Sequence, residues 1–250
     1  MMIKEERHKL IMREVNLHNK VLSNDLSILL DVSEDTVRRD LKELVEEGYI
    51  IKVHGGAISK SLATPFMKDN TVYAKDSKQV IAEKTLSLIK KDMVVLTEGG
   101  TTMLEFAKII PDHLTVTFFT ISPQVAITLS EKSNLEVITI GGKLSKNANL
   151  HTGSSVINQL SEIKADLCLL GANGFSSEEG LTDVDWEIVQ VKKAIIRSAR
   201  KTAVLCISEK LNSSRRLRIC ELSQVDYLIT ELDHDHPMMA AYNKEGLNVL

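Results

Sequence analysis

The chain has 250 residues, of which 43% are hydrophobic and 26% are charged, and its formal net charge is −3. This composition is ordinary for a globular protein and excludes a disordered or fibrous chain. The slight negative charge also excludes a protein coated in basic surface, so any affinity for nucleic acid has to come from a local patch.

Neither a targeting segment nor a membrane segment is recognisable in the sequence. The N-terminus is too highly charged for a signal peptide, and no apolar run approaches the roughly 18 residues that a membrane span needs. The three cysteines, Cys168, Cys206 and Cys220, have no close pairing and are expected to be reduced and buried. We therefore expect a cytoplasmic protein without disulfides, without a metal and without any other cofactor.

The first fifty residues predict three helices. The expected ranges are Lys4 to Leu17, Asn24 to Leu30 and Glu34 to Glu47, and two serines suited to N-caps, Ser23 and Ser33, precede the second and third. A short helix, a three-residue turn and a further helix form the order of a helix-turn-helix, whose last helix enters the major groove of DNA.

A basic cluster falls outside the apolar stripe of the third predicted helix. It consists of Arg38, Arg39 and Lys42, which in a helix-turn-helix would contact guanine or phosphate. The same residues could instead form a solvated helix face, since charged exteriors are the norm for helices. Residues 1–57 also hold more acidic than basic side chains, so composition alone leaves both interpretations open.

A wing is predicted after the third helix, from a strand at Tyr49 to Val53 and a tight turn at His54 to Gly56. We expect residues 1–58 to form a winged helix-turn-helix domain. Its expected DNA-contacting residues are Ser33, Thr36, Arg38, Arg39, Lys42, Lys52 and His54.

This region resembles the DeoR-type bacterial regulators. The resemblance rests on the run VSEDTVRRDL at Val32–Leu41, on Gly48, and on VHGGA at Val53–Ala57. It implies a transcriptional regulator that binds double-stranded operator DNA through the winged helix-turn-helix.

Residues 59–74 have no clear periodicity and predict a linker, and residues 75–250 then alternate short apolar runs with helical stretches. This alternation favours an α/β fold with a mostly parallel sheet covered by helices on both faces. The predicted strands are Met93–Leu96, Thr115–Phe119, Leu135–Ile140, Leu167–Leu170, Ala203–Ile207 and Tyr227–Ile229, and the predicted helices are Ser77–Lys91, Thr101–Ile110, Pro123–Glu131, Val156–Glu162, Glu187–Ala199 and Pro237–Lys244.

Several glycine turns follow these predicted strands, at the edge where parallel sheets bind ligands. Free backbone amides at a helix start, hydroxyl groups and nearby lysines suit an anion such as a phosphate. Taken alone, each glycine turn is more often a structural connection than a ligand-binding site. The predicted effector-binding residues are Glu98, Gly99, Gly100, Thr101, Thr102, Gly141, Gly142, Lys143, Gly171, Asn173 and Lys210.

The resemblance to DeoR-type regulators continues through this half of the chain. It implies a sensor domain similar to ribose-5-phosphate isomerases and coenzyme-A transferases, with a phosphate loop at Glu98–Thr102. Glu98 stands where the family has aspartate, Ile121 where it has asparagine and Ile207 where it has aspartate. Whether these departures abolish or retune the binding of a sugar phosphate stays open.

An isomerase and a metal sensor are the two alternatives to a regulator. An isomerase needs a general base near its substrate, and this chain has Asn173 where that enzyme family has a carboxylate, although Glu187 and Lys192 lie nearby in sequence. A metal sensor is suggested by the run Asp233–His236, which a polar loop before Pro237 explains as well. We expect neither an enzyme nor a metal site.

The sequence as a whole predicts a ligand-controlled repressor of a carbohydrate or related catabolic operon. Small DNA-binding domains act in pairs on repeated sites, so a homodimer or higher homo-oligomer is expected, with no membrane partner. A small phosphorylated effector would favour a subunit arrangement that spaces the winged domains wrongly for the operator, a coupling that typically carries about 1–3 kcal/mol.

Overall fold

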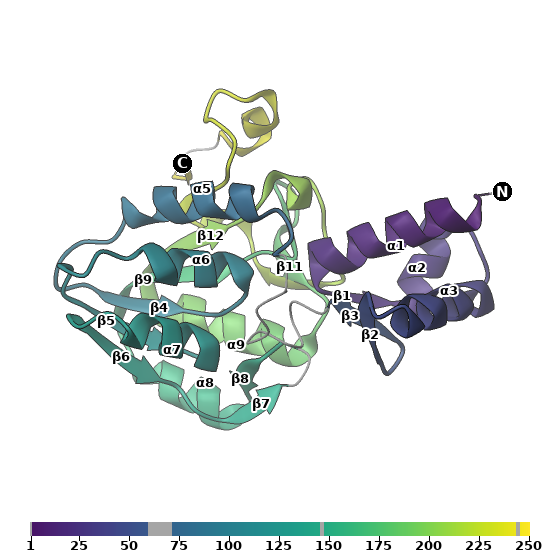
Figure 1. Ribbon diagram of the computed structural model, residues 1–250. Helices are drawn as coiled ribbons and strands as arrows, with labels where there is room; N and C mark the ends of the chain where they lie inside the picture. The colour runs from purple at the N-terminus through teal and green to yellow at the C-terminus, as the bar shows by residue number, and fades with distance from the viewer. Residues whose placement is uncertain (1, 60–71, 146–147, 244–245) are drawn as a thin grey trace. The chain divides into compact units, whose positions relative to one another are not determined.

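The computed structural model describes residues 2–59, 72–145, 148–243 and 246–250, and the chain divides into two compact units (Figure 1). The first contains residues up to Tyr73, and the second holds nearly all described residues from Ala74 onward.

The first unit contains three helices and a small antiparallel sheet. Its core is formed by apolar side chains from all of these elements, among them the fully buried Ile11, Val15 and Val37. The elements are α1 (Lys4–His18), β1 (Lys20–Leu22), α2 (Ser23–Leu30), α3 (Glu34–Glu46), β2 (Ile50–Val53) and β3 (Gly56–Ser59), with the strand order β1-β3-β2. The three helices and the hairpin of the wing match the sequence prediction, whereas β1 was not predicted.

The two predicted N-caps have different outcomes. The Oγ of Ser33 accepts a hydrogen bond from the amide of Thr36 at 3.3 Å, which confirms Ser33 as the cap of α3. The prediction for Ser23 was wrong, because Leu22 occupies the N-cap position of α2 and no side chain caps this helix. Here β1 continues directly into α2, and the Ser23 amide donates to the carbonyl oxygen of Gly55 at 2.8 Å instead.

The second unit is built on a sheet of seven strands that all run parallel, with the order β15-β14-β12-β9-β4-β5-β6. Most residues of its central strands are buried, as is typical of a sheet covered on both faces. The strands are β4 (Val94–Thr97), β5 (Val116–Thr120), β6 (Leu135–Thr139), β9 (Ala165–Gly171), β12 (Ala199–Leu205), β14 (Tyr227–Ile229) and β15 (Asn248–Val249).

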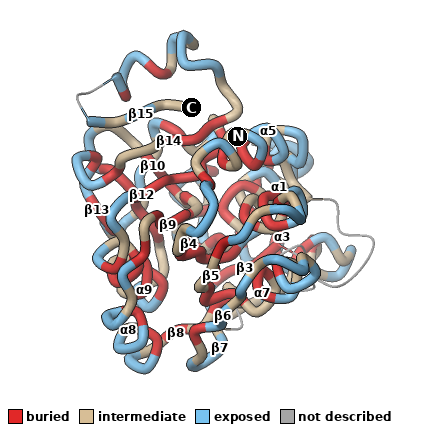
Figure 2. Tube along the Cα trace, turned by 90° about the vertical axis from the view of Figure 1, so that its left-hand side faces the viewer, coloured by how far each residue is buried: buried red, intermediate tan, exposed pale blue. Residues whose placement is uncertain are grey.

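Helices lie on both faces of this sheet, as the sequence predicted. Figure 1 shows α5 (Lys75–Leu86), α6 (Thr101–Ile109) and α7 (Pro123–Ser130) on one face. The other face carries α8 (Ser154–Ser161) and α9 (Trp186–Arg197). The strands between the two layers are mostly buried (Figure 2).

Two small antiparallel elements beside the main sheet were not predicted. One is the hairpin of β7 (Lys143–Ser145) and β8 (Leu150–Thr152), and the other is a sheet in the order β10-β11-β13. The strands of that sheet are β10 (Gly174–Ser176), β11 (Gly180–Asp183) and β13 (Leu217–Cys220), and short 3-10 turns lie at η1 (Ser208–Lys210) and η2 (Leu222–Gln224).

The predicted last helix, Pro237–Lys244, is a 3-10 helix over Pro237–Tyr242 (η3) rather than an α-helix, and Lys244 lies outside the described residues. The buried side chain of Tyr242 anchors this turn. Its hydroxyl donates to the carbonyl oxygen of Phe175 at 3.1 Å and accepts from the amide of Asn212 at 2.9 Å. These tertiary contacts fix the segment in a short, tight helix that the apolar pattern did not indicate.

The three cysteines are buried and free, as predicted. Burial raises the pKa of the Cys206 thiol to about 12, so it stays protonated and unreactive near neutral pH. None of the helices in the described ranges is both long and apolar enough to cross a membrane.

Candidate functional site

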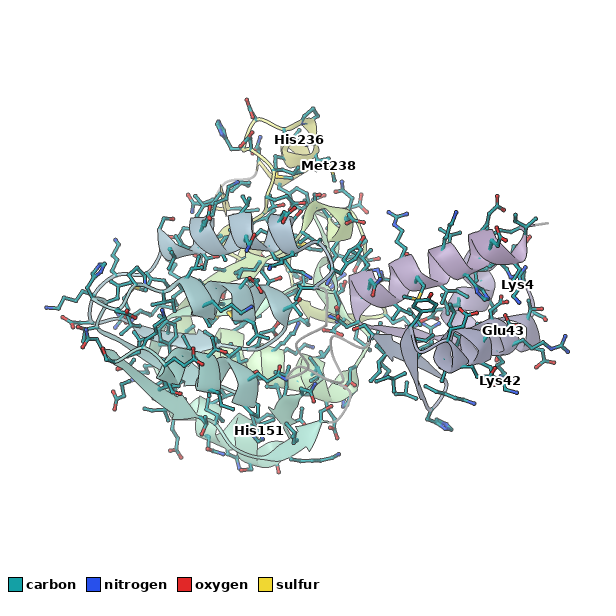
Figure 3. All side chains as sticks on the ribbon, in the orientation of Figure 1. Lys4, Lys42, Glu43, His151, His236 and Met238 are labelled. Atoms are coloured by element: carbon teal, nitrogen blue, oxygen red, sulfur yellow. The ribbon has the colours of Figure 1, made fainter. Side chains whose placement is uncertain are left out.

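The predicted basic cluster lies exposed on α3, where Figure 3 labels Lys42. The guanidinium of Arg38 is held by two acids of its own helix, at 2.9 Å from Glu34 Oε2 and 3.1 Å from Asp35 Oδ1. Arg39 has no hydrogen bond or ion pair with any described residue, so its guanidinium is available to an external partner. The two neighbouring arginines are therefore not equivalent.

A buried ion pair, which the sequence did not reveal, holds α3 against α1. Arg7 donates from Nε to Asp40 Oδ2 at 2.7 Å and from Nη2 to Asp40 Oδ1 at 2.9 Å. Asp40 directly follows Arg39, so this bidentate pair fixes the backbone that presents the arginine. At the surface beside it, Lys4 and Glu43 form an ion pair between the same two helices (Figure 3).

The wing is a tight antiparallel hairpin with His54 and Gly55 at its tip. Lys52 and His54 are exposed, as a role in DNA contact requires. Gly55 has φ of +74°, a conformation that side chains rarely adopt. At Gly56 a Cβ atom would lie 1.9 Å from the carbonyl oxygen of Val21, so only glycine lets β1 approach β3 closely.

The carboxyl ends of β4, β6, β9 and β12 meet at one edge of the sheet, because all of these strands are parallel. Glu98, after β4, accepts a hydrogen bond at Oε1 from the amide of Gly171 at 2.7 Å. Lys210, after β12, donates to the carbonyl oxygen of Ala172 at 2.9 Å. Three of the predicted effector-binding segments are thus brought into contact.

A buried charged triad of Glu98, Asp183 and Lys192 lies at this edge. Lys192 Nζ is 3.2 Å from Glu98 Oε2 and 3.3 Å from Asp183 Oδ2, and it donates to the carbonyl oxygen of Gly171 at 2.9 Å. Asn173 donates to Asp183 Oδ1 at 3.0 Å. Asp183 was not predicted, because a single aspartate in a short strand gives no local signal.

Burial and ion pairing shift the pKa values of the two carboxyl groups in this triad. Burial raises the pKa of Glu98 despite the nearby ammonium group of Lys192. Burial also acts to raise the pKa of Asp183, but Lys192, Asn173 and the Val184 amide outweigh it and the pKa is lowered. The two carboxyls of the triad therefore shift in opposite directions, although both lie beside the same ammonium group.

The loop after β4 presents open polar groups at the start of α6. Gly100 has φ of +95° and is exposed, and a Cβ atom there would meet nothing within 4 Å. Thr101 and Thr102 follow, half-buried, in the first turn of the helix. The free amides and the positive end of the helix dipole favour an anion at this position.

The predicted residues Gly141, Gly142 and Lys143 belong to a second group of contacts, beside His151 (Figure 3). Lys143 Nζ is 3.2 Å from Glu187 Oε1, and this hydrogen bond lowers the pKa of Glu187. Lys143 is exposed and pairs with Glu187 rather than with the triad.

The positions that depart from the DeoR-type pattern are buried. Ile121 and Ile207 are 1% and 3% exposed, so neither side chain offers a surface at the edge of the sheet. The carbonyl oxygen of Ile121 instead accepts from the amide of His151 at 2.8 Å, which holds β8 beside the strand ends.

The run Asp233–His236 lies directly before η3. Within the described ranges no three histidine, cysteine, aspartate or glutamate side chains are arranged to hold a metal ion. His236 Nδ1 accepts from the Met238 amide at 3.2 Å and caps η3 (Figure 3).

Both units of the chain match models of known domain families. Residues 7–62 match the DeoR-like helix-turn-helix domain, and residues 74–232 match the DeoR C terminal sensor domain. The chain belongs to the DeoR family. The resemblance found in the sequence is confirmed over both units.

Curated relatives cover nearly the whole length of this DeoR-family chain. It is 31% identical to the HTH-type transcriptional regulator GolR of Listeria innocua, over 98% of this chain and 97% of the relative. It is 33% identical to the HTH-type transcriptional repressor GlcR of Bacillus subtilis, over 100% and 96%. The DeoR-family protein is therefore a DNA-binding transcriptional regulator and not an enzyme.

A further relative is the glycerol-3-phosphate regulon repressor of Haemophilus influenzae, which is 31% identical over 90% of this chain and 88% of the relative. Among solved structures, a translation initiation factor eIF-2B from Pyrococcus horikoshii has a TM-score of 0.48 at 14% identity, over 92% and 82% of the chains. Ribose 5-phosphate isomerase from Methanocaldococcus jannaschii has a TM-score of 0.40 at 21% identity, over 55% and 54%. Both structural likenesses are distant.

Proposed function

We propose that the protein represses a carbohydrate or related catabolic operon and is released from, or held on, its operator by a small phosphorylated metabolite. The observation that carries this proposal is the match of both units to DeoR-family domains. Relatives named as repressors, including a repressor of the glycerol-3-phosphate regulon, support the choice of repression and of a phosphorylated ligand.

In this proposal residues 1–58 bind DNA, residues 59–74 link the units, and residues 75–250 sense the effector. Residues 60–71 of the linker lie outside the described residues. The division of the described chain near Tyr73 supports these boundaries.

The proposed DNA contacts fall into groups with different roles. The hydroxyls of Ser33 and Thr36 lie 3.0 Å apart at the N-terminus of α3, where the positive end of the helix dipole favours a phosphate group. Arg39 is the proposed base-reading residue because its guanidinium is free of acidic partners in the described chain. The full proposed set is Ser33, Thr36, Arg38, Arg39, Lys42, Lys52 and His54.

The proposed effector residues also divide by role. Glu98 and Asn173 are engaged with Lys192 and Asp183, so we assign them to positioning the loops rather than to direct contact. Gly100, with its open surroundings, supplies an amide for a phosphate group. The proposed set is Glu98, Gly99, Gly100, Thr101, Thr102, Gly141, Gly142, Lys143, Gly171, Asn173 and Lys210.

The repressor proposal is tested by fluorescence anisotropy with DNA from the region upstream of the gene, in moderate salt with excess competitor DNA. We expect saturable binding tighter than about 10⁻⁷ M that depends on Arg39. Binding no tighter than the non-specific range of about 10⁻⁴–10⁻⁶ M, on this DNA and in a genome-wide pull-down, would exclude sequence-specific repression.

We further propose that the protein acts in the cytoplasm as a homodimer or higher homo-oligomer. Each DNA-binding unit is small, and paired units read half-sites about 34–36 Å apart. Sedimentation of the protein with an operator and with a single half-site tests this, and full affinity of a monomer for one half-site would contradict it.

A further inference from the structure

The C-terminal segment contributes one aromatic side chain to the interior of the second unit, and the sequence did not indicate it. Tyr242, the last residue of η3, is fully buried. Its ring stacks on that of Phe175, which is also fully buried, with ring centroids 5.6 Å apart and planes at 14°. Tyr242 lies beyond residue 232, where the match to the DeoR sensor domain ends. The contact is therefore a feature of this chain that the family match does not describe.

The Tyr242 hydroxyl connects two segments, each of which follows a residue of the proposed effector set. It donates to the carbonyl oxygen of Phe175 at 3.1 Å, shortly after Asn173 in the chain. It accepts from the backbone amide of Asn212 at 2.9 Å, shortly after Lys210. The side-chain oxygen of Asn212 is a further acceptor for the same hydroxyl, at 3.0 Å. One buried hydroxyl thus joins the chain directly behind both segments.

The same two segments also contact each other directly. Lys210 donates from Nζ to the carbonyl oxygen of Ala172 at 2.9 Å. Leu211 pairs with Phe175 in an isolated parallel bridge. Tyr242 is therefore a third connection between the loop that contains Ala172 and the turn that contains Lys210.

The turn at Asn212 depends on this connection more than an ordinary loop would. Asn212 has φ of +53°, in the left-handed region, which asparagine tolerates better than most residues but which still has a cost. The Tyr242 hydroxyl contacts both the amide and the side-chain oxygen of this residue. Without the hydroxyl, the Asn212 amide would have to turn toward water, because an amide that loses its partner is costly to leave unpaired. We expect such a change to move Lys210 as well.

Tyr242 remains a hydrogen-bond donor at neutral pH. Burial raises the pKa of its hydroxyl above the ordinary value of 10.0, and the bond from the Asn212 amide opposes this only in part. The phenol therefore keeps its proton, and the donors and acceptors of the junction stay matched.

We propose that Tyr242 is a positioning residue of the effector site, whose hydroxyl holds Lys210 and the Gly171–Asn173 loop in the arrangement that binds the effector. The proposal rests on the proposed function, because the loop and the lysine belong to the proposed effector set. Tyr242 does not touch the effector and acts through Phe175 and Asn212. Since such coupling is reciprocal, effector binding also strengthens the contacts of η3 with the rest of the second unit.

The first experiment compares two tyrosine variants by isothermal titration of the full chain with inorganic phosphate. Tyr242→Phe removes the hydroxyl and leaves the ring to stack on Phe175, so it separates the hydrogen bonds from the packing. We expect it to bind phosphate at least about fivefold more weakly than the wild-type protein, as the loss of about one hydrogen bond predicts. Tyr227→Phe makes the same change at a half-buried tyrosine of β14 and should bind phosphate as the wild type does. Equal binding by wild type and Tyr242→Phe overturns the proposal.

Urea unfolding of the same variants separates positioning from a purely structural role. A structural role alone would lower the stability of the second unit and leave the phosphate affinity of the folded protein unchanged, and this outcome overturns the proposal. Operator affinity measured without phosphate should be the same for Tyr242→Phe and wild type, because Tyr242 lies outside the first unit.

A measurement on the wild-type protein keeps the proposal testable if Tyr242→Phe fails to fold. Hydrogen exchange with and without phosphate should show exchange slowed at least about fivefold at the Asn212 amide and within η3, as reciprocal coupling requires. The amides of the wing serve as the internal control and should not change. An unchanged rate at the Asn212 amide in saturating phosphate overturns the proposal.

Operator binding on the same preparation distinguishes the failure of this inference from the failure of the proposed function. Wild-type protein that binds its operator but no phosphate overturns the phosphorylated effector, and the positioning role with it. Phosphate binding that is equal in wild type and Tyr242→Phe overturns the role of Tyr242 alone. Phosphate binding that depends on Tyr242, without operator binding, overturns the repressor and supports the positioning role.

Discussion

The neighbouring Arg38 and Arg39 on α3 differ in the ion pairs that each would lose on binding DNA. To contact DNA, Arg38 has to break or share its ion pairs with two carboxylates. Arg39 has no ion pair with any described residue. A side chain that is already paired gains less from a new phosphate or base contact than one that is only solvated.

We therefore expect Arg39→Ala to weaken operator binding by about 1–3 kcal/mol, and Arg38→Ala to weaken it less. Arg200→Ala, at an exposed arginine of the second unit, is the matched control and should leave affinity unchanged. Fluorescence anisotropy at fixed salt measures all three. A larger loss for Arg38→Ala than for Arg39→Ala would contradict this ranking.

The Arg7–Asp40 pair gives a prediction about stability. Asp40→Ala leaves the guanidinium of Arg7 without its partner in a buried position, which we expect to cost the first unit about 3 kcal/mol. Amide hydrogen exchange of α1 and α3 in the full chain reports this loss. Glu43→Gln, which breaks only the exposed pair with Lys4, should have a much smaller effect. Equal effects of the two variants would show that burial does not strengthen the Arg7–Asp40 pair.

At the scale of elements, the sequence patterns predicted the strands that contain consecutive apolar residues. The strands β4, β5, β6, β9, β12 and β14 overlap their predicted ranges because each contains a short apolar run, which is buried in all of them except the edge strand β6. The hairpin β7–β8 and the sheet β10-β11-β13 have strands of three or four residues, too short to show a periodicity. Their pairing depends on contacts between distant segments.

Local sequence patterns also could not show which distant residues come together in the candidate effector site. The glycine turns after β4 and β9 were predictable because a parallel sheet gathers strand ends at one edge. Asp183 was not, because it joins the site through tertiary packing with Lys192 rather than through a local motif. Direct use of Glu98 and Asn173 by a ligand stays a prediction, and their observed bonds favour a positioning role.

The wing gives a prediction at this scale. Gly56→Ala places a Cβ atom 1.9 Å from the carbonyl oxygen of Val21 and should separate β1 from β3, at a cost of at least about 2 kcal/mol. Gly55→Ala meets nothing within 4 Å and carries only the cost of its positive φ, about 1 kcal/mol. Hydrogen exchange of the amides in β1 and β3 compares them, and an equal loss of protection in both variants would contradict the argument.

For the molecule as a whole, Lys78, which is buried on α5, makes stability depend on pH. Between about pH 7 and its ordinary value of 10.5, Lys78 is neutral in the folded protein and protonated in the unfolded chain. The unfolded state then binds more protons, so raising the pH stabilises the fold, by up to about 1.4 kcal/mol per pH unit.

We expect the second unit of the wild-type protein to become more stable between pH 7 and pH 8, and Lys78→Met to remove much of this rise. Urea unfolding followed by the fluorescence of Trp186, the single tryptophan of the chain, reports on that unit alone. Lys75→Met serves as the control and should keep the wild-type slope. A wild-type slope of zero would show that Lys78 is charged in the folded protein.

The strand order of the large sheet also has a consequence for how the protein is made. The inner strand β4 lies between β5, which follows it closely in the chain, and β9, which begins about 70 residues later. At a synthesis rate of about 5–20 residues per second, one edge of β4 waits roughly 4–14 s for its partner to leave the ribosome. During that time an apolar strand edge is open to other chains. We expect the sensor half of newly made protein to depend on chaperones, and the winged half to fold without them.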